Sequence, residues 1–518
     1  MAAARPGSGA TCYPWTVVVA DIAPGAGTAA TGKGGERRAV VAVLAVCALV
    51  VAAWALLRWS GVAPFGSDND EYRLVAQELA DSGRPLVAGI EATKYPLGYP
   101  LFLAGLELVG LAVTPLAVAA NLALVLALAG AVVLVARDAA VPAAPLPAAL
   151  FAVAGAGLWG SVYVVMPDLA FVVVSGLVLW QAGRLRTTPQ VWLLSGGVAV
   201  AVLLKSQGLL LAPAAALAVV VAGRPLRRWA WAPLAAGGGL TGAMAALNLP
   251  YAEHTTGYAR TFSLARATDA AAGDASLVDI AARLFTRAHL VLQDVGFAVI
   301  GFDVPPPWSW LVALALVAAG VRALWGSPPR RAYVLAFLAV WLPALAIWPY
   351  SSVRFQLPLV PVAAVGVGAL VSRLVRALPR AGPALAAAAL GLYLATSALR
   401  VAGDADREAA SVAPVARDTG AMAAWGRANI AEGEAIASFA YREVAYRLDR
   451  PVVALGYTSD MDELWRTARA GDARWLVVMP SLYGARGALE LQFLAAFGDR
   501  LRLAQDTATV DTYEILAP

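Results

Sequence analysis

Five ionisable residues stand where long apolar segments begin or end, although they are widely separated along the chain. They are Asp68 in SDNDEY, Lys94 in KYPLGYP, Asp168 in MPDLAF, Lys205 in LLKSQG and Arg354 in SSVRFQLP. A carboxylate can act as general base toward an acceptor hydroxyl, and cations can stabilise charge that develops on a phosphate leaving group. If the fold gathers these side chains, they predict a site for group transfer from a phosphate-linked donor.

A purely structural interpretation of the same residues stays open. Ser67 followed by Asp70 has the form of a capping box, and the apolar residues within 74–80 suit a short amphipathic helix on a bilayer surface. Asp68, Asp70 and Glu71 would then be solvated side chains of that helix. A single Lys or Arg near a membrane boundary is also often interfacial, so the functional interpretation depends on convergence of the five residues.

Composition indicates a membrane protein. Of the 518 residues, 60% are hydrophobic and 14% are charged, and the mean hydropathy is +0.69. Soluble domains carry about 25% charged residues, so we predict a polytopic α-helical protein of the cell membrane with about 11–13 transmembrane helices. Lys and Arg cluster between apolar runs, which indicates cytoplasmic loops and gives no reason to expect a nucleic-acid partner.

The placement of positive charge predicts the topology. Residues 1–38 are rich in Gly, Ala and Pro and are expected to form a disordered cytoplasmic tail. The apolar run 39–57 follows Arg37 and Arg38 and is expected to be a first span that runs outward. Further Arg clusters then predict a transmembrane domain over 39–400, with a first outer loop at 60–96 and a large outer loop at 250–307.

One part of this topology is inconsistent. Three apolar runs (about 97–113, 115–136 and 142–163) separate Tyr99 from Asp168, although both of these residues should lie outside. One run must therefore be broken, re-entrant or merged with a neighbour. Prolines at the start of the third run make it the expected exception.

After residue 402 the composition becomes mixed and charged, which predicts a small extracytoplasmic α/β domain over 403–518. The expected strands are 435–439, 451–455, 475–479 and 509–515, and the expected helices are 422–429, 461–470 and 488–497.

Other catalytic patterns find little support. The chain has no Walker loop, HExxH or Ser-His-Asp pattern, and its two cysteines form no metal or disulfide framework. The chain has only two histidines, which excludes a histidine-rich metal site. His254 could still contact substrate or be a single metal ligand. A loop histidine whose hydrogen bonds are satisfied by its neighbours is the simpler interpretation.

Four short elements follow one another on the predicted outer side. They are Asp68 with Tyr72 and Ala76, the segment from Lys94 to Pro100, the acidic position Asp168, and the segment from Arg354 to Pro361. In these elements the membrane portion, about residues 39 to 400, resembles the GT-C superfamily of membrane glycosyltransferases, which includes protein O-mannosyltransferases and aminoarabinose transferases. Relatives also carry a C-terminal domain of the periplasmic type.

The resemblance implies transfer of a sugar from a polyprenyl-phosphate carrier, held in membrane lipid, to a glycan, lipid or protein acceptor on the outer face. It implies Asp68 as catalytic base or acceptor-positioning acid and Asp168 as the second acid, with Lys94 and Arg354 holding the donor phosphate. Lys205 joins them by its location. The expected substrate-binding residues are Tyr72, Tyr99 and His254.

The chain departs from the family pattern at two points. The usual acidic pair is Asp68-Asn69 here, so Asp70 is the alternative to Asp68. Relatives with a metal near the second span often carry Glu directly before the Lys, whereas this chain has Thr93, with Glu91 close by. This departure argues against a bound divalent metal, and no other cofactor is predicted.

Two other functions stay open at this point. A lipid or solute transporter would favour inverted repeats and paired helix breaks at the membrane midplane, neither of which is evident. A non-catalytic relative could bind lipid-linked sugar, or a partner protein, without needing the Asp68 carboxylate.

Overall fold

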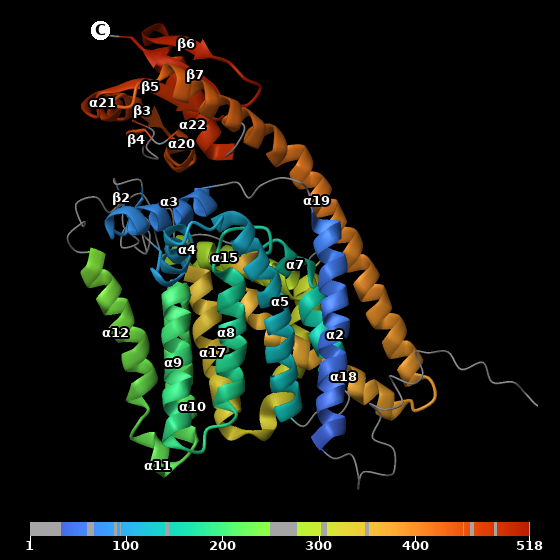
Figure 1. Ribbon diagram of the computed structural model, residues 1–518. Helices are drawn as coiled ribbons and strands as arrows, with labels where there is room; N and C mark the ends of the chain where they lie inside the picture. Colours follow the sequence, from blue (N-terminus) through green and yellow to red (C-terminus); the bar gives the residue numbers. More distant parts are fainter. Residues whose placement is uncertain are drawn as a thin grey trace, which may run out of the picture.

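The computed structural model consists of a layer of apolar helices with a small mixed domain on one side (Figure 1). The predicted tail, 1–38, lies outside the described residues except for its last part, which begins the first helix. The described residues are 33–59, 67–87, 91–93, 95–139, 144–248, 277–301, 308–347, 352–448, 450–455, 460–480 and 484–516.

The helical layer confirms a multi-pass membrane fold. Five described helices are long and apolar enough to cross a bilayer, and four further apolar helices are shorter, so the predicted count of about 11–13 spans stays a prediction. The first half contains α2 (Lys33–Arg58), α3 (Ser67–Ser82), α4 (Gly98–Leu108), α5 (Val113–Asp138), α6 (Pro145–Ala154), α7 (Ala156–Trp159), α8 (Asp168–Ala182) and α9 (Thr188–Leu204). The second half contains α10 (Leu211–Val221), α11 (Arg224–Arg227), α12 (Trp231–Asn248), α15 (Leu277–Ile300), α16 (Trp308–Ala323), α17 (Pro328–Ile347), α18 (Val360–Ala377) and α19 (Gly382–Asn429), with short 3-10 turns at η1 (Ser206–Leu210), η3 (Leu324–Gly326), η4 (Val353–Phe355) and η5 (Leu357–Leu359).

Small residues set the packing of this layer. A Cβ atom on Gly320 of α16 would lie 2.0 Å from the Val362 carbonyl oxygen of α18, and one on Gly366 would lie 2.0 Å from the Leu316 carbonyl oxygen. Neither position can hold a side chain without separating the helices. Membrane helices associate through such small residues because burial against lipid gives them no hydrophobic driving force.

The helix ends define two faces of the layer. We call the side that meets the C-terminal domain the domain face, and the opposite side, where α11 lies, the arginine face (Figure 1). Arg227 belongs to α11, Arg184 follows the end of α8, and Arg330 lies in the first turn of α17. Helix α5 ends at the arginine face, where Asp138 contacts both Arg184 and Arg330.

Helix α4 resolves the topological inconsistency. Its 11 residues span only about 16 Å, whereas a bilayer core is about 30 Å thick. Tyr99 at its start packs edge-on against Tyr72 of α3, and Glu107 near its end lines a cleft with Asp81 at the far end of α3. Helix α4 therefore runs along α3 at the domain face and does not cross the layer.

The expectation that the third run would be the exception is right about a break in that run but wrong about its path. This run is broken at Gly155, which separates α6 from α7. The chain nevertheless passes from Asp138 at the arginine face to Val165, whose amide contacts Asn69 of α3 at the domain face. The third run thus crosses, and the shortened first run is the one that does not.

The predicted outer loop 250–307 contains a helix that the sequence analysis missed. Helix α15 packs against α7, α16 and α17, and its buried residues Val291, Val295 and Ala298 belong to the main core. Residues 249–276 and 302–307 lie outside the described part of the chain. Polar residues interrupt the apolar ones throughout the first half of α15, so it lacks the continuous apolar run of a span, which is why it resembled a loop.

The C-terminal domain is α/β, as expected, and one continuous helix links it to the layer. Helix α19 extends 48 residues along α2 and into the domain (Figure 1). The sheet order is β4-β3-β5-β7-β6, with β3, β4 and β5 parallel and β6 and β7 antiparallel to their neighbours. Strands β3 (Ala435–Ser438), β4 (Val452–Ala454), β5 (Ala473–Val478), β7 (Asp511–Ile515) and helices α21 (Met461–Ala470) and α22 (Gly484–Phe497) match predictions, whereas β6 (Leu501–Gln505) and α20 (Tyr441–Leu448) were missed.

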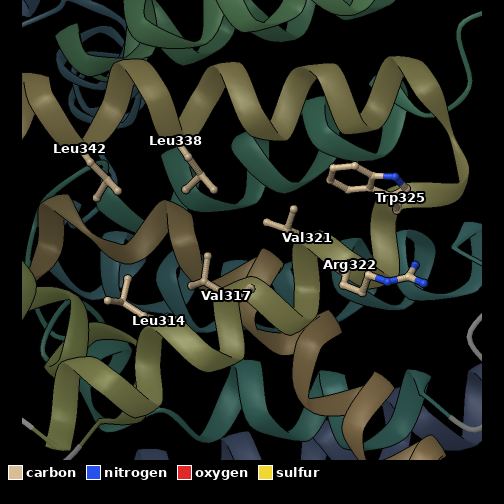
Figure 2. A pocket seen from close by; sticks show the side chains of 8 residues that line it. Leu314, Val317, Val321, Arg322, Trp325, Leu338 and Leu342 are labelled. Atoms are coloured by element: carbon tan, nitrogen blue, oxygen red, sulfur yellow. The ribbon is translucent and has the colours of Figure 1, made fainter.

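An apolar groove lies between α16 and α17 on the half of the layer nearer the arginine face. Its volume is about 760 Å³. The two helices diverge there, because α16 packs mainly against α18 while α17 packs mainly against α10. Figure 2 shows Val317, Leu338 and Leu342 along the groove, with Trp325 and Arg322 at one end.

Candidate active site

One turn of α3 carries four consecutive polar residues toward three different parts of the molecule. Successive side chains on a helix point about 100° apart, so Asp68, Asn69, Asp70 and Glu71 cannot share one environment. Asp68 is partly exposed, whereas the other three are buried. Asp68, Asn69 and the pair Asp70 and Glu71 therefore have different structural tasks.

Asp68 accepts two hydrogen bonds from charged or phenolic donors. Tyr95 Oη donates to Oδ1 at 2.6 Å, and Arg354 Nη2 donates to Oδ2 at 2.5 Å. Arg354 lies in η4, between α17 and α18, and its Nη1 lies 2.8 Å from the Met166 sulfur. The Asp68–Arg354 pair keeps 22% and 30% of its side-chain surface exposed, so small molecules can reach it.

Asp168 forms the second half of the site. It is the first residue of α8 and is buried, and the Lys205 ammonium at the end of α9 donates a short hydrogen bond to its Oδ1. Carboxylates are favourable at helix N-termini, where the backbone amides have no partner within the helix. The local sequence thus places Asp168 where its charge is stabilised twice.

Phe355 joins the two ion pairs. Its ring centroid lies 4.8 Å from the Lys205 ammonium and 5.4 Å from the Arg354 guanidinium, within the range of cation–π attraction. We call Asp68, Arg354, Lys205 and Asp168 the charged site. Two acids and two cations from four segments meet there at the domain face.

Two asparagines shape the segment that leads into Asp168. Asn69 Oδ1 accepts a hydrogen bond of 2.6 Å from the Val165 amide. Asn121 of α5 donates to the carbonyl oxygens of Val162 and Val164 at 3.0 and 2.8 Å. Buried backbone groups need partners, and these side chains supply them where the segment is not helical.

The aromatic residues lie behind Asp68. Tyr72 stacks on Tyr95 with ring centroids 4.5 Å apart, and Tyr99 meets Tyr72 edge-on at 5.4 Å. Burial, together with the negative charges of Glu71 and Asp68, raises the pKa of Tyr95 well above its ordinary value. Tyr95 is therefore a hydrogen-bond donor to Asp68 over the whole physiological pH range.

Asp70 has a different environment from Asp68. Its carboxylate is fully buried and accepts from Arg73 at 3.3 Å and from Arg447 of the C-terminal domain at 3.0 Å. Glu71, also buried, pairs with Arg442 of that domain at 2.8 Å. The interpretation of these two acids as solvated residues of a surface helix is wrong, because the C-terminal domain covers them.

Of the predicted site residues, Asp68, Asp168, Lys205 and Arg354 are brought together, and Tyr72 and Tyr99 lie next to them. Lys94 and His254 lie outside the described residues. Within the part of the chain that the structure describes, no group of three or more His, Cys, Asp or Glu is placed to hold a metal ion. Both acids of the charged site face cations in this structure.

Sequence reasoning missed Tyr95 and Asn121 as site residues. Tyr95 directly follows Lys94 and could have been included with that segment. Asn121 is a buried polar residue within the apolar part of α5, which by itself is a signal of function or of a structural hydrogen bond.

The fold is that of the GT-C membrane glycosyltransferases. No protein-family model and no curated protein matches the chain by sequence. Solved structures, in contrast, match over nearly its whole length, and the predicted resemblance is confirmed at the level of the fold.

Two proteins represent these neighbours. ArnT from Cupriavidus metallidurans, solved bound to undecaprenyl phosphate, is 15% identical with a TM-score of 0.55, and the match covers 92% of this chain and 99% of that protein. The Archaeoglobus fulgidus oligosaccharyltransferase, tethered to an acceptor peptide, is 12% identical with a TM-score of 0.54, covering 91% of this chain and 73% of that protein.

Proposed function

We propose that this membrane protein transfers a sugar from a polyprenyl-phosphate carrier to an acceptor. The observation that carries the proposal is the charged site, in which two carboxylates and two cations from distant segments meet around Phe355. The fold adds support, since ArnT, one structural neighbour, was solved with undecaprenyl phosphate.

The proposed reaction needs one base and a place for the leaving phosphate. Asp68 accepts the proton of the acceptor hydroxyl while the acceptor oxygen bonds to the anomeric carbon of the sugar. The bond between that carbon and the phosphate oxygen breaks, and its electron pair leaves with the carrier phosphate. Lys205, Arg354 and Lys94 stabilise the resulting charge.

The present contacts suggest how substrate would reorganise the site. Arg354 now holds Asp68 Oδ2 at 2.5 Å, so its movement toward a donor phosphate would free that oxygen for the acceptor proton. Tyr95 would keep Asp68 Oδ1 in place through its own hydrogen bond. Asp168 would remain fixed by Lys205 and orient that ammonium toward the phosphate.

Exposure favours Asp68 over Asp70 as the base. The Asp68 side chain is 22% exposed, whereas that of Asp70 is fully buried and pairs with Arg447. A general base must come within hydrogen-bond distance of the proton it accepts. Asp70 could do so only if the C-terminal domain moved away.

The domain face is the outer face in this proposal. Arginines near the ends of α8, α11 and α18 lie on the opposite side, which agrees with the excess of Lys and Arg in cytoplasmic loops. The C-terminal domain would then be extracytoplasmic, and the reaction would occur beside the outer leaflet, where the carrier lipid can stay in the bilayer.

A transfer assay tests the proposal. Purified protein in lipid would be mixed with a panel of polyprenyl-phosphate sugars and a cell-envelope extract, comparing the wild type with Asp68→Asn and Asp168→Asn. We expect transfer that falls by about 10²–10⁴-fold in Asp68→Asn, the usual contribution of a general base. Carrier binding, measured separately, should persist.

Three other outcomes would redirect the proposal. Full activity in Asp68→Asn with loss in Asp70→Asn would move the base by two residues. Activity in both variants would remove the catalytic assignment. Carrier binding without transfer across the whole panel would favour a transporter or a binding protein.

A further inference from the structure

The C-terminal domain and α3 share one core. Leu74 and Val75 of α3 are buried in the same cluster as Met422 of α19 and Val444 and Leu448 of α20. The ion pairs at Asp70 and Glu71 extend this contact into the first turn of α3. Helix α3 therefore belongs as much to the C-terminal domain as to the membrane layer.

Two buried ion pairs fix the first turn of α3 from this side. Arg447 Nη1 lies 3.0 Å from Asp70 Oδ2, and the two side chains are 16% and 0% exposed. Arg442 Nε lies 2.8 Å from Glu71 Oε2, with 12% and 1% exposure. The guanidinium of Arg73 also lies 5.0 Å from the ring centroid of Tyr446, another α20 residue.

The same helical turn holds the charged site. Asp68 lies two residues before Asp70 and accepts from Arg354, and Asn69 between them binds the Val165 amide near Asp168. A helix is stiff over four residues because consecutive backbone hydrogen bonds link them. Movement at Asp70 or Glu71 must therefore displace Asp68 relative to Asp168.

We infer that Arg442 and Arg447 are positioning residues of the transfer site. Through them the C-terminal domain fixes the position of the proposed base, Asp68, relative to Asp168. This inference rests on the proposed function. Neither arginine touches the charged site, so their effect is on geometry: a displacement of about 1 Å can lower turnover by about 10²-fold. The domain is thus a structural part of the active site in addition to any acceptor contact it makes.

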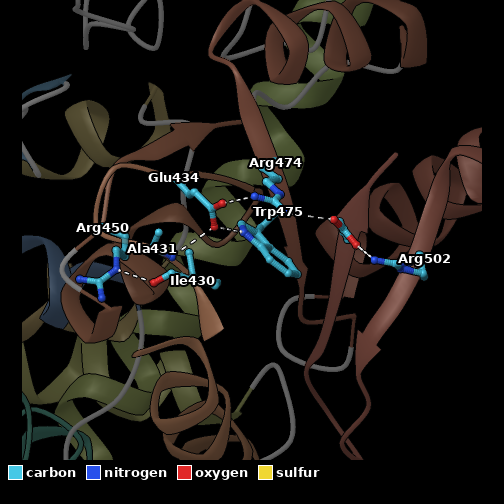
Figure 3. A network of polar contacts seen from close by, with 8 residues as sticks. Ile430, Ala431, Glu434, Arg450, Arg474, Trp475 and Arg502 are labelled. Atoms are coloured by element: carbon cyan, nitrogen blue, oxygen red, sulfur yellow. Dashed lines mark hydrogen bonds and ion pairs between the residues drawn. The ribbon is translucent and has the colours of Figure 1, made fainter. Parts of the chain in front are cut away.

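Arg474 provides a matched control within the same domain. Figure 3 shows it with Glu434 and Trp475 at the start of β5, the central strand of the sheet, in a network that does not include α3. Its side chain is 55% exposed. Arg474→Met removes one guanidinium from the domain, as Arg447→Met does, but leaves the contact with α3 intact.

The test measures turnover and hydrogen exchange in the full-length protein in lipid. In Arg447→Met we expect kcat to fall by about tenfold or more, with KM for the polyprenyl-phosphate sugar within about threefold, because a misplaced base mainly affects the transition state. Amide exchange should become faster in α3 and in residues 161–167 but not in β3 or β5. Arg474→Met should change neither quantity.

A double variant separates loss of the arginine's contact with α3 from the cost of leaving a buried carboxylate without that arginine. Glu71→Gln with Arg442→Met removes both members of the Glu71–Arg442 pair, so α3 should be better protected from exchange, and kcat higher, than in Arg442→Met alone. If Arg447→Met does not fold, Arg447→Lys and Arg442→Lys supply the same comparison, with smaller changes in the same direction expected.

Some results would overturn the inference. Unchanged kcat and unchanged exchange in α3 would show that α20 does not position the site, and faster exchange confined to the C-terminal sheet would assign these arginines to domain stability alone. The exchange measurement needs no substrate. Absence of transfer in every protein, wild type included, would therefore count against the proposed function while exchange still decided the positioning role.

Discussion

Helices α8 and α17 have charged residues near both of their ends, and the two ends differ in how the charges are matched. At the domain face, Asp168 begins α8 and Arg354 follows α17, and both belong to the charged site. At the arginine face, Arg184 follows α8 and Arg330 lies in the first turn of α17, and both contact Asp138. We call Asp138, Arg184 and Arg330 the arginine-face cluster.

The charged site has two acids for two cations, whereas the arginine-face cluster has one acid for two cations. In the arginine-face cluster, Asp138 Oδ2 lies 3.6 Å from an Arg184 nitrogen and 3.8 Å from an Arg330 nitrogen. Arg184 also lies over the Trp180 ring. Surplus positive charge suits the cytoplasmic boundary of a membrane. Balanced charge that remains partly exposed suits the proposed reaction, in which the site would bind a phosphate and take up a proton. Under that proposal, similar residues have different functions at the two ends.

Replacing one arginine at each end by methionine should give the largest difference in kcat between two variants. Arg354→Met removes the guanidinium that can follow the leaving phosphate, and we expect kcat to fall by about 10²–10³-fold, as for other lost transition-state donors. Arg184→Met removes an exposed arginine from the other end and should stay within about twofold of the wild type. Steady-state transfer with both variants in the same lipid is the measurement; equal losses would remove the distinction between the two ends.

Lys205→Met should have the largest effect on stability. It leaves the Asp168 carboxylate, whose side chain is 3% exposed, without its cation. Breaking a buried pair on one side costs about 3–5 kcal/mol, so thermal unfolding in lipid should occur at a clearly lower temperature. Lys205→Met with Asp168→Leu should recover part of this loss. A single variant as stable as the wild type would mean that Asp168 finds another donor.

Tyr95→Phe should have a smaller effect that does not vary with pH. It removes one hydrogen bond to a carboxylate, worth about 1.5–3 kcal/mol, so kcat/KM should fall by about tenfold. Because the pKa of Tyr95 is raised well above its ordinary value, the ratio of wild type to variant should be constant from about pH 7 to 9.5. A ratio that shrinks above about pH 8 would show that Tyr95 ionises there.

The same pKa shift affects stability with a definite sign. The folded protein binds the Tyr95 proton more tightly than the unfolded chain, so this contribution is present below the unfolded pKa of about 10 and is lost as pH rises above it.

Local sequence predicts the segments that carry chemistry better than it predicts what covers them. Asp168 and Arg354 were selected because they belong to a set of charges beside apolar runs on one predicted side, and because their segments resemble elements of the GT-C family. Asp70 and Glu71 were misinterpreted because their partners, Arg447 and Arg442, lie in the C-terminal domain, far away along the chain. No local pattern contains that information.

Length and hydropathy also have limits in this fold. The run beginning near Tyr99 is apolar enough for a span, but only tertiary contact with α3 shows that α4 lies along the domain face. Helix α15 shows the reverse case, since a helix packed against other helices needs no long apolar run. Four of the five described strands of the C-terminal sheet were easier to predict, because short apolar runs between turn residues are typical of strands, whereas β6 was missed.

Asp138→Asn should give the smallest effect and is the most direct test of the comparison. It leaves the buried Arg330 guanidinium without a carboxylate, but Asp138 is 24% exposed and its distance to Arg330 is already 3.8 Å. We therefore expect a loss of stability smaller than that of Lys205→Met and unchanged kcat per folded molecule. Unfolding temperature and turnover should be measured on one preparation. If Asp138→Asn lowered kcat as strongly as Arg354→Met, the two ends of α8 and α17 would be coupled, and the arginine-face cluster could no longer be regarded as a structural anchor alone.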